Sequence, residues 1–251
     1  MSAGSAVTGD YSADELTAVA QLLGLPAFPD VSGAVFADLD PGAQQAVLRS
    51  ARRSLLARGV VEIDDEGVLR VAAPHGALFR LALAPAAVVN AEIRRPDSVV
   101  TRSYYVLPAA AVEHASVVGH IHRLSQFEPS ELFDRVVEFL GLVERPSGET
   151  AETELGISDL NRALAGETDE SEFGQAVSSL VSTSFVRSVT RSNGMLVGGE
   201  LRWIDTGDAG LWLVEPSEDD PERARVRRAD TSELRDELLS YLPGSERQPA
   251  T

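Results

Sequence analysis

Hydrophobic and polar positions follow helix-like and strand-like periods in an order that occurs twice along the chain. In the first half, apolar residues three and four positions apart predict helices over residues 12–23 and 41–58. Residues 60–71 have the pattern of a hairpin, and an apolar helix follows to about residue 89. Three strands and a closing helix are then predicted at residues 90–95, 99–107, 117–124 and 129–140.

The second half repeats this pattern after a polar stretch. Residues 144–155 are rich in Pro, Gly, Ser, Glu and Thr, which is typical of a linker. Two helices are expected at residues 158–165 and 170–188. Three strands and a last helix are expected at residues 195–205, 211–215, 224–228 and 231–242.

Short sequence matches support an internal repeat. Residues 91–95 resemble residues 199–203, 108 positions later, and the helix 129–140 resembles 231–242, 102 positions later. A weaker match joins Gln45-Ala46-Val47 to Gln175-Ala176-Val177, 130 positions later. Self-similar segments in the same order indicate duplication of one structural unit.

The expected fold class is therefore α+β. Duplicated α-α-β-β-β-α units would form a pseudo-twofold, mainly antiparallel central sheet flanked by helical bundles. The N-terminal subdomain would span residues 11–143, with residues 60–89 as an insertion. Residues 144–155 would link it to a C-terminal subdomain at 156–243, and the two would form one body.

Composition narrows the classes of function. The chain has 251 residues, no cysteine, only arginine as a strong base, and a net charge of −17. Such a charge disfavours nucleic acid and anionic membranes, whose affinity depends on cation–phosphate contacts. No signal peptide or membrane-length apolar segment is recognisable, so a cytoplasmic protein is expected. The lysine-free composition is typical of a GC-rich genome such as that of an actinobacterium.

The sequence contains no recognisable catalytic motif, and neither enzymatic activity nor a cofactor is expected. His120 and His122 alternate on a predicted strand and could face the same side, as zinc ligands do, with His114 or Glu113 as a third ligand. Nothing in the sequence specifies that third ligand. An ordinary pair of strand histidines is the simpler interpretation, so no metal site is predicted.

The sequence contains two arginine clusters, and the first suggests an alternative function. Arg49, Arg52, Arg53 and Arg58 lie on a helix that precedes a hairpin, which resembles part of a winged-helix DNA-binding module. The second cluster lies between residues 223 and 228, beside the acidic stretch 217–222. Mutual neutralisation on a sheet face is the simpler explanation of this second cluster.

Three segments resemble a known family. They are the helix Glu15-Leu16-Thr17-Ala18-Val19-Ala20-Gln21-Leu22-Leu23-Gly24-Leu25, the stretch Leu55-Leu56-Ala57-Arg58-Gly59-Val60-Val61 leading into the turn at Asp64–Gly67, and residues 203–214 with Trp203 and Trp212. Together they resemble the EspG family, the cytosolic substrate chaperones of type VII (ESX) secretion. The family fold consists of two related subdomains around an antiparallel sheet.

The resemblance implies a non-catalytic chaperone, monomeric or homodimeric, that binds the apolar helical region of secreted PE–PPE-like proteins. In the family, the sheet and the C-terminal helices contact the substrate. By region, this points to residues 195–214 and 170–188. The candidate partner-binding residues are Leu201, Trp203, Leu211, Trp212, Phe173, Val177 and Phe185.

Overall fold

The computed structural model describes residues 7–28, 31, 36, 38–117, 120–145, 151–167, 171–192, 195–217 and 219–244. The chain divides into two compact units. The first unit comprises residues 1–88 and 103–131, and the second comprises residues 89–102 and 132–251. Among the described residues, no helix is long and apolar enough to cross a membrane.

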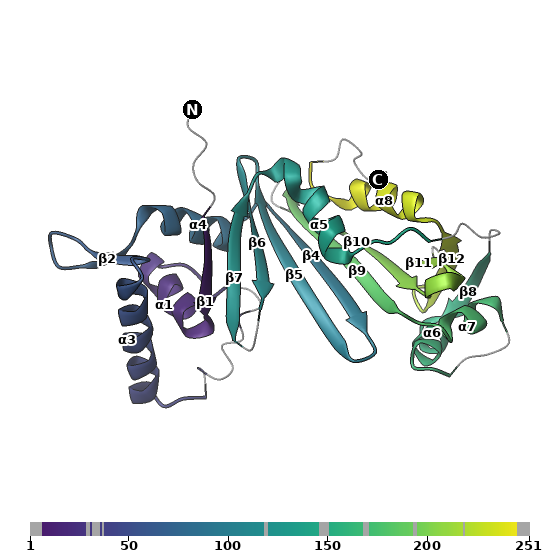
Figure 1. Ribbon diagram of the computed structural model, residues 1–251, viewed down its shortest axis with the longest axis horizontal. Helices are drawn as coiled ribbons and strands as arrows, with labels where there is room; N and C mark the ends of the chain where they lie inside the picture. The colour runs from purple at the N-terminus through teal and green to yellow at the C-terminus, as the bar shows by residue number, and fades with distance from the viewer. Residues whose placement is uncertain are drawn as a thin grey trace. The chain divides into compact units, whose positions relative to one another are not determined.

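The first unit contains a helical cluster beside a small group of strands (Figure 1). Its elements are β1 (Thr8–Ser12), α1 (Ala13–Leu23), α3 (Pro41–Ala57), β2 (Val61–Ile63), β3 (Leu69–Val71), α4 (Ala73–Leu83), β6 (Ala110–Ser116) and β7 (Ile121–Phe127). Helix α1 begins at a capping box in which the Ser12 side chain and Glu15 bond each other's backbone N–H groups. Its core includes Leu16, Leu55, Leu78, Phe79 and Leu124.

The second unit carries most of the remaining elements. They are α5 (Leu132–Leu140), β8 (Glu152–Gly156), α6 (Ile157–Leu164), α7 (Glu172–Val177), β9 (Ser182–Ser192), β10 (Met195–Asp205), β11 (Leu211–Pro216), β12 (Arg223–Ala229) and α8 (Thr231–Tyr241). Strand β4 (Ala87–Arg95) lies almost entirely in this unit, whereas β5 (Ser98–Leu107) is divided at residue 102. Two 3₁₀ turns, η1 (Pro129–Glu131) and η2 (Gly207–Ala209), precede α5 and β11.

The main sheet confirms the α+β class and contains ten strands in the order β1-β7-β6-β5-β4-β9-β10-β11-β12-β8. The same sequence of elements occurs twice. A strand, two helices, four strands and a helix run from β1 to α5 and again from β8 to α8. Within the described residues, β2, β3 and α4 occur only in the first copy. We call these two copies the first and second repeats.

Hydrogen-bond register makes the repeats comparable residue by residue. Strand β7 pairs antiparallel with β1 and β6, as β12 pairs with β8 and β11. The pair Ala111↔Phe127 corresponds to Leu211↔Ala229, and Ser12↔Ile121 corresponds to Gly156↔Arg223. The equivalent of a residue in β6 is therefore 100 positions later, and that of a residue in β7 is 102 positions later.

This register corrects part of the sequence analysis. The match of residues 129–140 with 231–242 joins equivalent helices, but the match of 91–95 with 199–203 joins β4 to β10, whereas β4 corresponds to β9. The error arises because the helix expected at residues 170–188 includes residues 182–188, which belong to β9. Only residues 172–177 are helical there, and β9 follows. Ser182, Ser184 and Ser188 fill three of its buried positions and Val186 fills another, so the alternation has only a weak apolar signal of a strand.

Two further expectations change. The strand predicted at residues 117–124 overlaps the start of β7, and its residues 118–119 lie outside the described residues. Strands β6 and β9 were not expected, so each repeat has four strands after its helices where three were expected. The predicted linker includes β8 and also Arg145, whose guanidinium forms two hydrogen bonds of 2.9 and 3.1 Å with Asp205. Residues 146–150 of that stretch lie outside the described residues. The proposed subdomain boundaries stay a prediction.

Candidate protein-binding surface

Strands β9 and β10 form a long antiparallel hairpin in the second unit, paired from Met195↔Ser192 to Asp205↔Ser182. Side chains alternate between its two faces. One face carries Leu201 and Trp203, which are buried, and helix α8 packs on β9 and β10. Gly199 permits this packing, because a Cβ atom there would lie 2.9 Å from the Tyr241 ring of α8.

The opposite face is covered near β11 and β12 by α6 and α7. Its apolar cluster joins both helices to the strands and includes Leu160, Phe173, Ile204, Trp212, Val214 and Val226. The aromatic rings of Phe173 and Trp212 meet edge to face, with centroids 5.4 Å apart. This cluster belongs to the part of the face formed by β11, β12 and the end of β10.

The rest of this face of the hairpin is more exposed. Phe185 is half-buried, and the Arg187 guanidinium lies 6.0 Å from its ring centroid. Arg187 and Arg202 both hold Glu200, each with a contact of 2.5 Å, and their side chains are more than half exposed. By alternation Leu196 lies on the same side. We call Phe185, Arg187, Leu196, Glu200 and Arg202 the open face.

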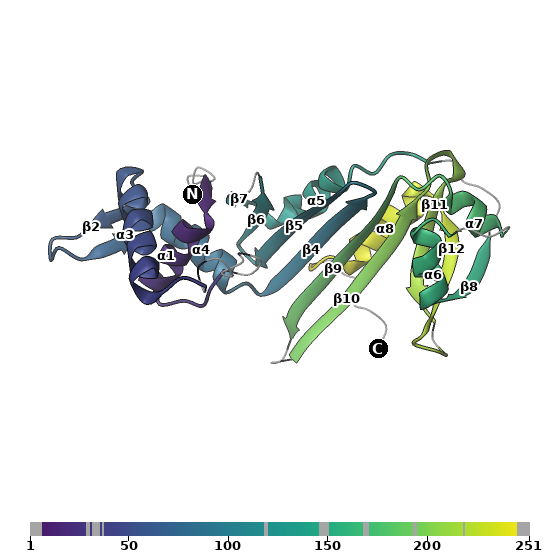
Figure 2. The same cartoon turned by 90° about the horizontal axis from the view of Figure 1, so that it is seen from below.

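The end of the hairpin is apolar. Met195, Leu196 and Val197 are 67%, 71% and 47% exposed. Figure 2 shows this end of β9 and β10 extending beyond α8. We call these three residues the hairpin tip. Contiguous exposed apolar side chains rimmed by polar groups are typical of protein interaction sites.

The open face is basic within an acidic chain. The hairpin carries Arg187, Arg191 and Arg202, whereas the whole protein has a net charge of −17. Partial burial opposes the charge of Glu200, but hydrogen bonds from Arg187 and Arg202 outweigh it and hold the pKa of Glu200 below its ordinary value. Glu200 therefore stays ionised and holds the two arginines in place, where their exposed sides can meet acidic groups of a partner.

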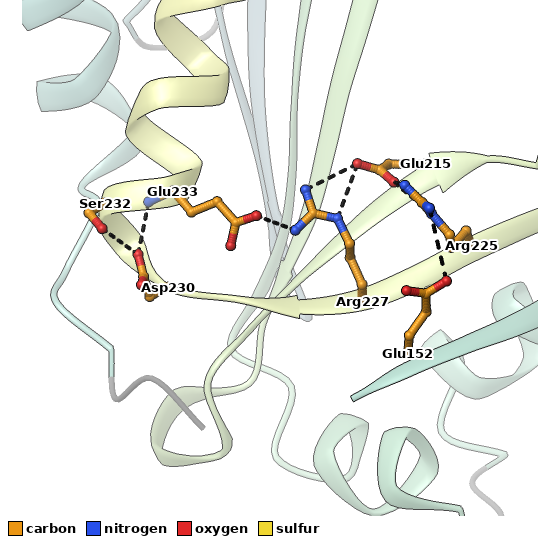
Figure 3. A network of polar contacts seen from close by, with 7 residues as sticks. All are labelled: Glu152, Glu215, Arg225, Arg227, Asp230, Ser232 and Glu233. Atoms are coloured by element: carbon orange, nitrogen blue, oxygen red, sulfur yellow. Dashed lines mark hydrogen bonds and ion pairs between the residues drawn. The ribbon is translucent and has the colours of Figure 1, made fainter. Parts of the chain in front are cut away.

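On the α8 face, arginines and carboxylates neutralise each other (Figure 3). Arg227 bonds Glu215 of β11 and Glu233 of α8, and Arg225 also bonds Glu215. Burial opposes the charge of Glu215, yet the hydrogen bonds from these two arginines keep its pKa below the ordinary value. Arg225 and Arg227 are therefore neutralised by carboxylates of β11 and α8, whereas the sequence pointed to the acidic stretch 217–222.

The predicted site residues occupy three places. Leu201, Trp203 and Leu211 are buried in the core of the second unit, and Phe173 and Val177 of α7 are buried in the cluster that also contains Trp212. Phe185 alone lies on the open face. The hairpin tip was absent from the predicted set. Its signal in the sequence is three successive apolar residues directly after Asn193-Gly194, because side chains on both faces of a hairpin end cannot all be buried.

The histidines adopt a different arrangement from the one considered above. His122 is buried and His120 is exposed, whereas the Nε2 atom of His114 lies 2.9 Å from Nδ1 of His122. The Tyr105 hydroxyl lies 3.3 Å from Nδ1 of His114. In the described part of the chain, no three side chains of His, Cys, Asp or Glu gather as metal ligands.

The helix and hairpin considered for DNA binding form as α3, β2 and β3, but two of their arginines bind within the chain. Arg58 bonds the buried carboxylate of Glu15 at 2.9 Å, and Arg52 bonds Gln21 at 3.2 Å. Arg49 and Arg53 are exposed. The positive charge of this helix is thus partly neutralised by its own unit.

Comparison with known proteins shows the fold. The structure is similar to that of the Mycobacterium tuberculosis type VII secretion system chaperone EspG5, solved in complex with a PE25–PPE41 dimer. The TM-score is 0.61 at 14% sequence identity, and the similarity covers 98% of this chain and 100% of that chain. No protein-family model matches the sequence, and no curated protein matches it. The shared feature is an EspG-like α+β fold over the whole chain.

Proposed function

We propose that the protein is a non-catalytic chaperone that binds an apolar helical region of a secreted PE–PPE-like protein in the cytoplasm. The observation that carries this proposal is the full-length similarity to a chaperone whose solved complex contains a PE25–PPE41 dimer. The hairpin tip offers an apolar contact surface, and the arginines of the open face favour a helix with acidic residues beside its apolar stripe.

The direct test is co-expression with a PE–PPE-like pair encoded in the same genome, followed by size-exclusion chromatography. A stable complex with the pair is expected, and its mass would also show whether the chaperone binds as a monomer or a homodimer. Absence of a complex with every such pair of the host would contradict the proposal.

Substitution then tests the surface. Leu196→Asp places a charge on a residue that is 71% exposed, so it should weaken binding at least tenfold, about 1.4 kcal/mol, while the melting temperature stays unchanged. Val99→Asp is the matched control, because Val99 is a 55% exposed apolar residue near the turn of the β4–β5 hairpin. Equal loss of binding in both variants would argue against a specific role of the hairpin tip.

The DNA-binding alternative predicts a salt-sensitive shift of duplex DNA that depends on Arg49 and Arg53. The chaperone proposal predicts no shift even at low salt, where electrostatic binding is strongest.

A further inference from the structure

Two buried N–H donors without hydrogen-bond acceptors belong to neighbouring residues of the second unit. Within the described part of the chain, Nε1 of Trp212 and Nε of Arg228 are both buried and have no hydrogen-bond partner. Trp212 and Arg228 face each other as register partners on β11 and β12, so their side chains project from the same face of the sheet. Buried donors normally have an acceptor, so two adjacent exceptions indicate a missing group.

The surroundings supply positive charge and a route to solvent. The Arg228 side chain is 18% exposed, and its Nη1 atom lies 3.7 Å from the carboxylate of Glu172, which is 62% exposed. That distance is too long for a hydrogen bond. Gly210 makes room for the guanidinium, since a Cβ atom there would lie 3.1 Å from Nε of Arg228. The Arg228 side chain is therefore partly exposed, although its Nε atom is buried.

The repeat indicates that these donors are not required by the fold. Register places Val112 and Gln126 of the first repeat at the positions of Trp212 and Arg228. Gln126 and Arg228 also make the same backbone bond, from their N–H groups to the carbonyls of Val7 and Ala151. Two repeats with equivalent backbones thus differ in a pair of buried donors, and only the second repeat combines an indole with a guanidinium.

We propose that Trp212 and Arg228 form a recognition site for a carboxylate group, with one oxygen bonded by the indole N–H and the other by the guanidinium. A carboxylate accepts hydrogen bonds only, has two oxygens, and complements the arginine charge, which a neutral amide does not. The group would replace the loose contact of Arg228 with Glu172. This site is independent of the hairpin tip and of the proposed chaperone function.

The indole N–H group reports directly on such a contact. In ¹⁵N-labelled full-length protein, the two tryptophans give two indole resonances, and Trp212→Phe identifies that of Trp212. Sodium acetate should shift the Trp212 resonance saturably and leave that of Trp203 in place. Sodium chloride at equal ionic strength and neutral acetamide should produce no saturable shift.

Arg228→Gln is the decisive variant, because the first repeat has glutamine at the equivalent position and keeps the same backbone bond. It should abolish the acetate response while the circular dichroism spectrum and melting temperature stay unchanged, and Arg228→Lys should retain a weakened response. An acetate response that survives Arg228→Gln, an equal response to acetamide, or no response to any carboxylate would overturn the site.

Binding experiments with peptides distinguish a carboxylate of a polypeptide from a small carboxylate anion. A capped peptide with one aspartate is compared with its asparagine counterpart and with acetate. Tighter binding of the aspartate peptide than of acetate assigns the site to a polypeptide ligand, and tighter binding of acetate assigns it to a small anion. Either result supports a carboxylate site, and failure to bind a PE–PPE-like protein would not affect it.

Discussion

The first and second repeats share one topology but differ in the polar groups that they bury. The first repeat encloses Glu15 with Arg58, and His114 with His122. At the positions of the two histidines, the second repeat has Val214 and Ala224. Instead, it buries Nε1 of Trp212 and Nε of Arg228, at the positions where the first has Val112 and Gln126. A duplicated backbone therefore tolerates different buried polar groups, which makes each repeat a natural control for the other.

The largest expected difference in stability is between substitutions in the equivalent strands β6 and β11. Leu213 is buried, whereas its equivalent Glu113 is half-buried. Leu213→Asp should destabilise the protein by about 4 kcal/mol, because it replaces an apolar core side chain with a carboxylate at a buried position. Glu113→Leu should change stability by less than about 1 kcal/mol. Urea unfolding measures the stability of both variants, and similar losses in the two would contradict this expected difference.

The second prediction compares two carboxylates, each three residues after the N-cap of its helix, in α1 and in α6. Glu15 accepts bonds from Ser12, Ser54 and Arg58 and is buried, whereas Asp159 of α6 is 61% exposed. Glu15→Gln should cost about 2 kcal/mol, since a neutral amide replaces a buried carboxylate that accepts hydrogen bonds from charged and polar donors. Asp159→Asn should cost less than about 0.5 kcal/mol. Equal losses of stability in chemical denaturation would show that the buried contacts of Glu15 add nothing to the stability of the protein.

The third prediction concerns pH. Burial, together with the nearby charge of His120, holds the pKa of His122 below its ordinary value. The unfolded state therefore binds protons more readily, and stability should be fully present above about pH 6.5 and decrease as the pH falls below it. Unfolding midpoints at pH 7.5 and 5.5 measure this loss.

The second repeat provides the control for this pH dependence. The double substitution His114→Val with His122→Ala introduces the residues found at positions 214 and 224. It should remove most of the loss between the two pH values. A loss that persists at full size in this variant would assign it to other groups, such as His75, whose pKa is also lowered by burial.

The smallest expected effect concerns the helix caps. Helix α1 has a Ser12 cap that accepts a bond from the backbone of Glu15, whereas α6 begins at Gly156 without a side-chain cap. Gly156→Ser should stabilise the protein by about 0.3 kcal/mol, and Ser12→Gly should destabilise it by a similar amount. A new Cβ at residue 156 would lie 3.2 Å from a carboxylate oxygen of Asp159. A loss of stability in Gly156→Ser would mean that Asp159 cannot move aside.

Much of the fold was predictable because its signals are local. The helices near residues 13–23, 41–57 and 231–241 carry caps and periodic apolar residues, and the hairpin at 61–71 carries a turn sequence. Strand β9 was missed because serine fills most of its buried positions, and β1 and β8 because five-residue edge strands leave too short a pattern. Which strand of one repeat corresponds to which strand of the other became clear only from the hydrogen-bond register, and a short sequence match does not contain that information.

The sequence by itself determined the fold class, the order of most elements and the acidic charge, since each depends on residue type and spacing along the chain. Only the tertiary structure decided which apolar residues face solvent. Trp203 and Trp212 became core residues because α8 and α7 pack against opposite faces of their strands, whereas Met195–Val197 lie at the hairpin end beyond α8. The exposure of a side chain depends on which elements pack against it, and these elements come from distant parts of the chain.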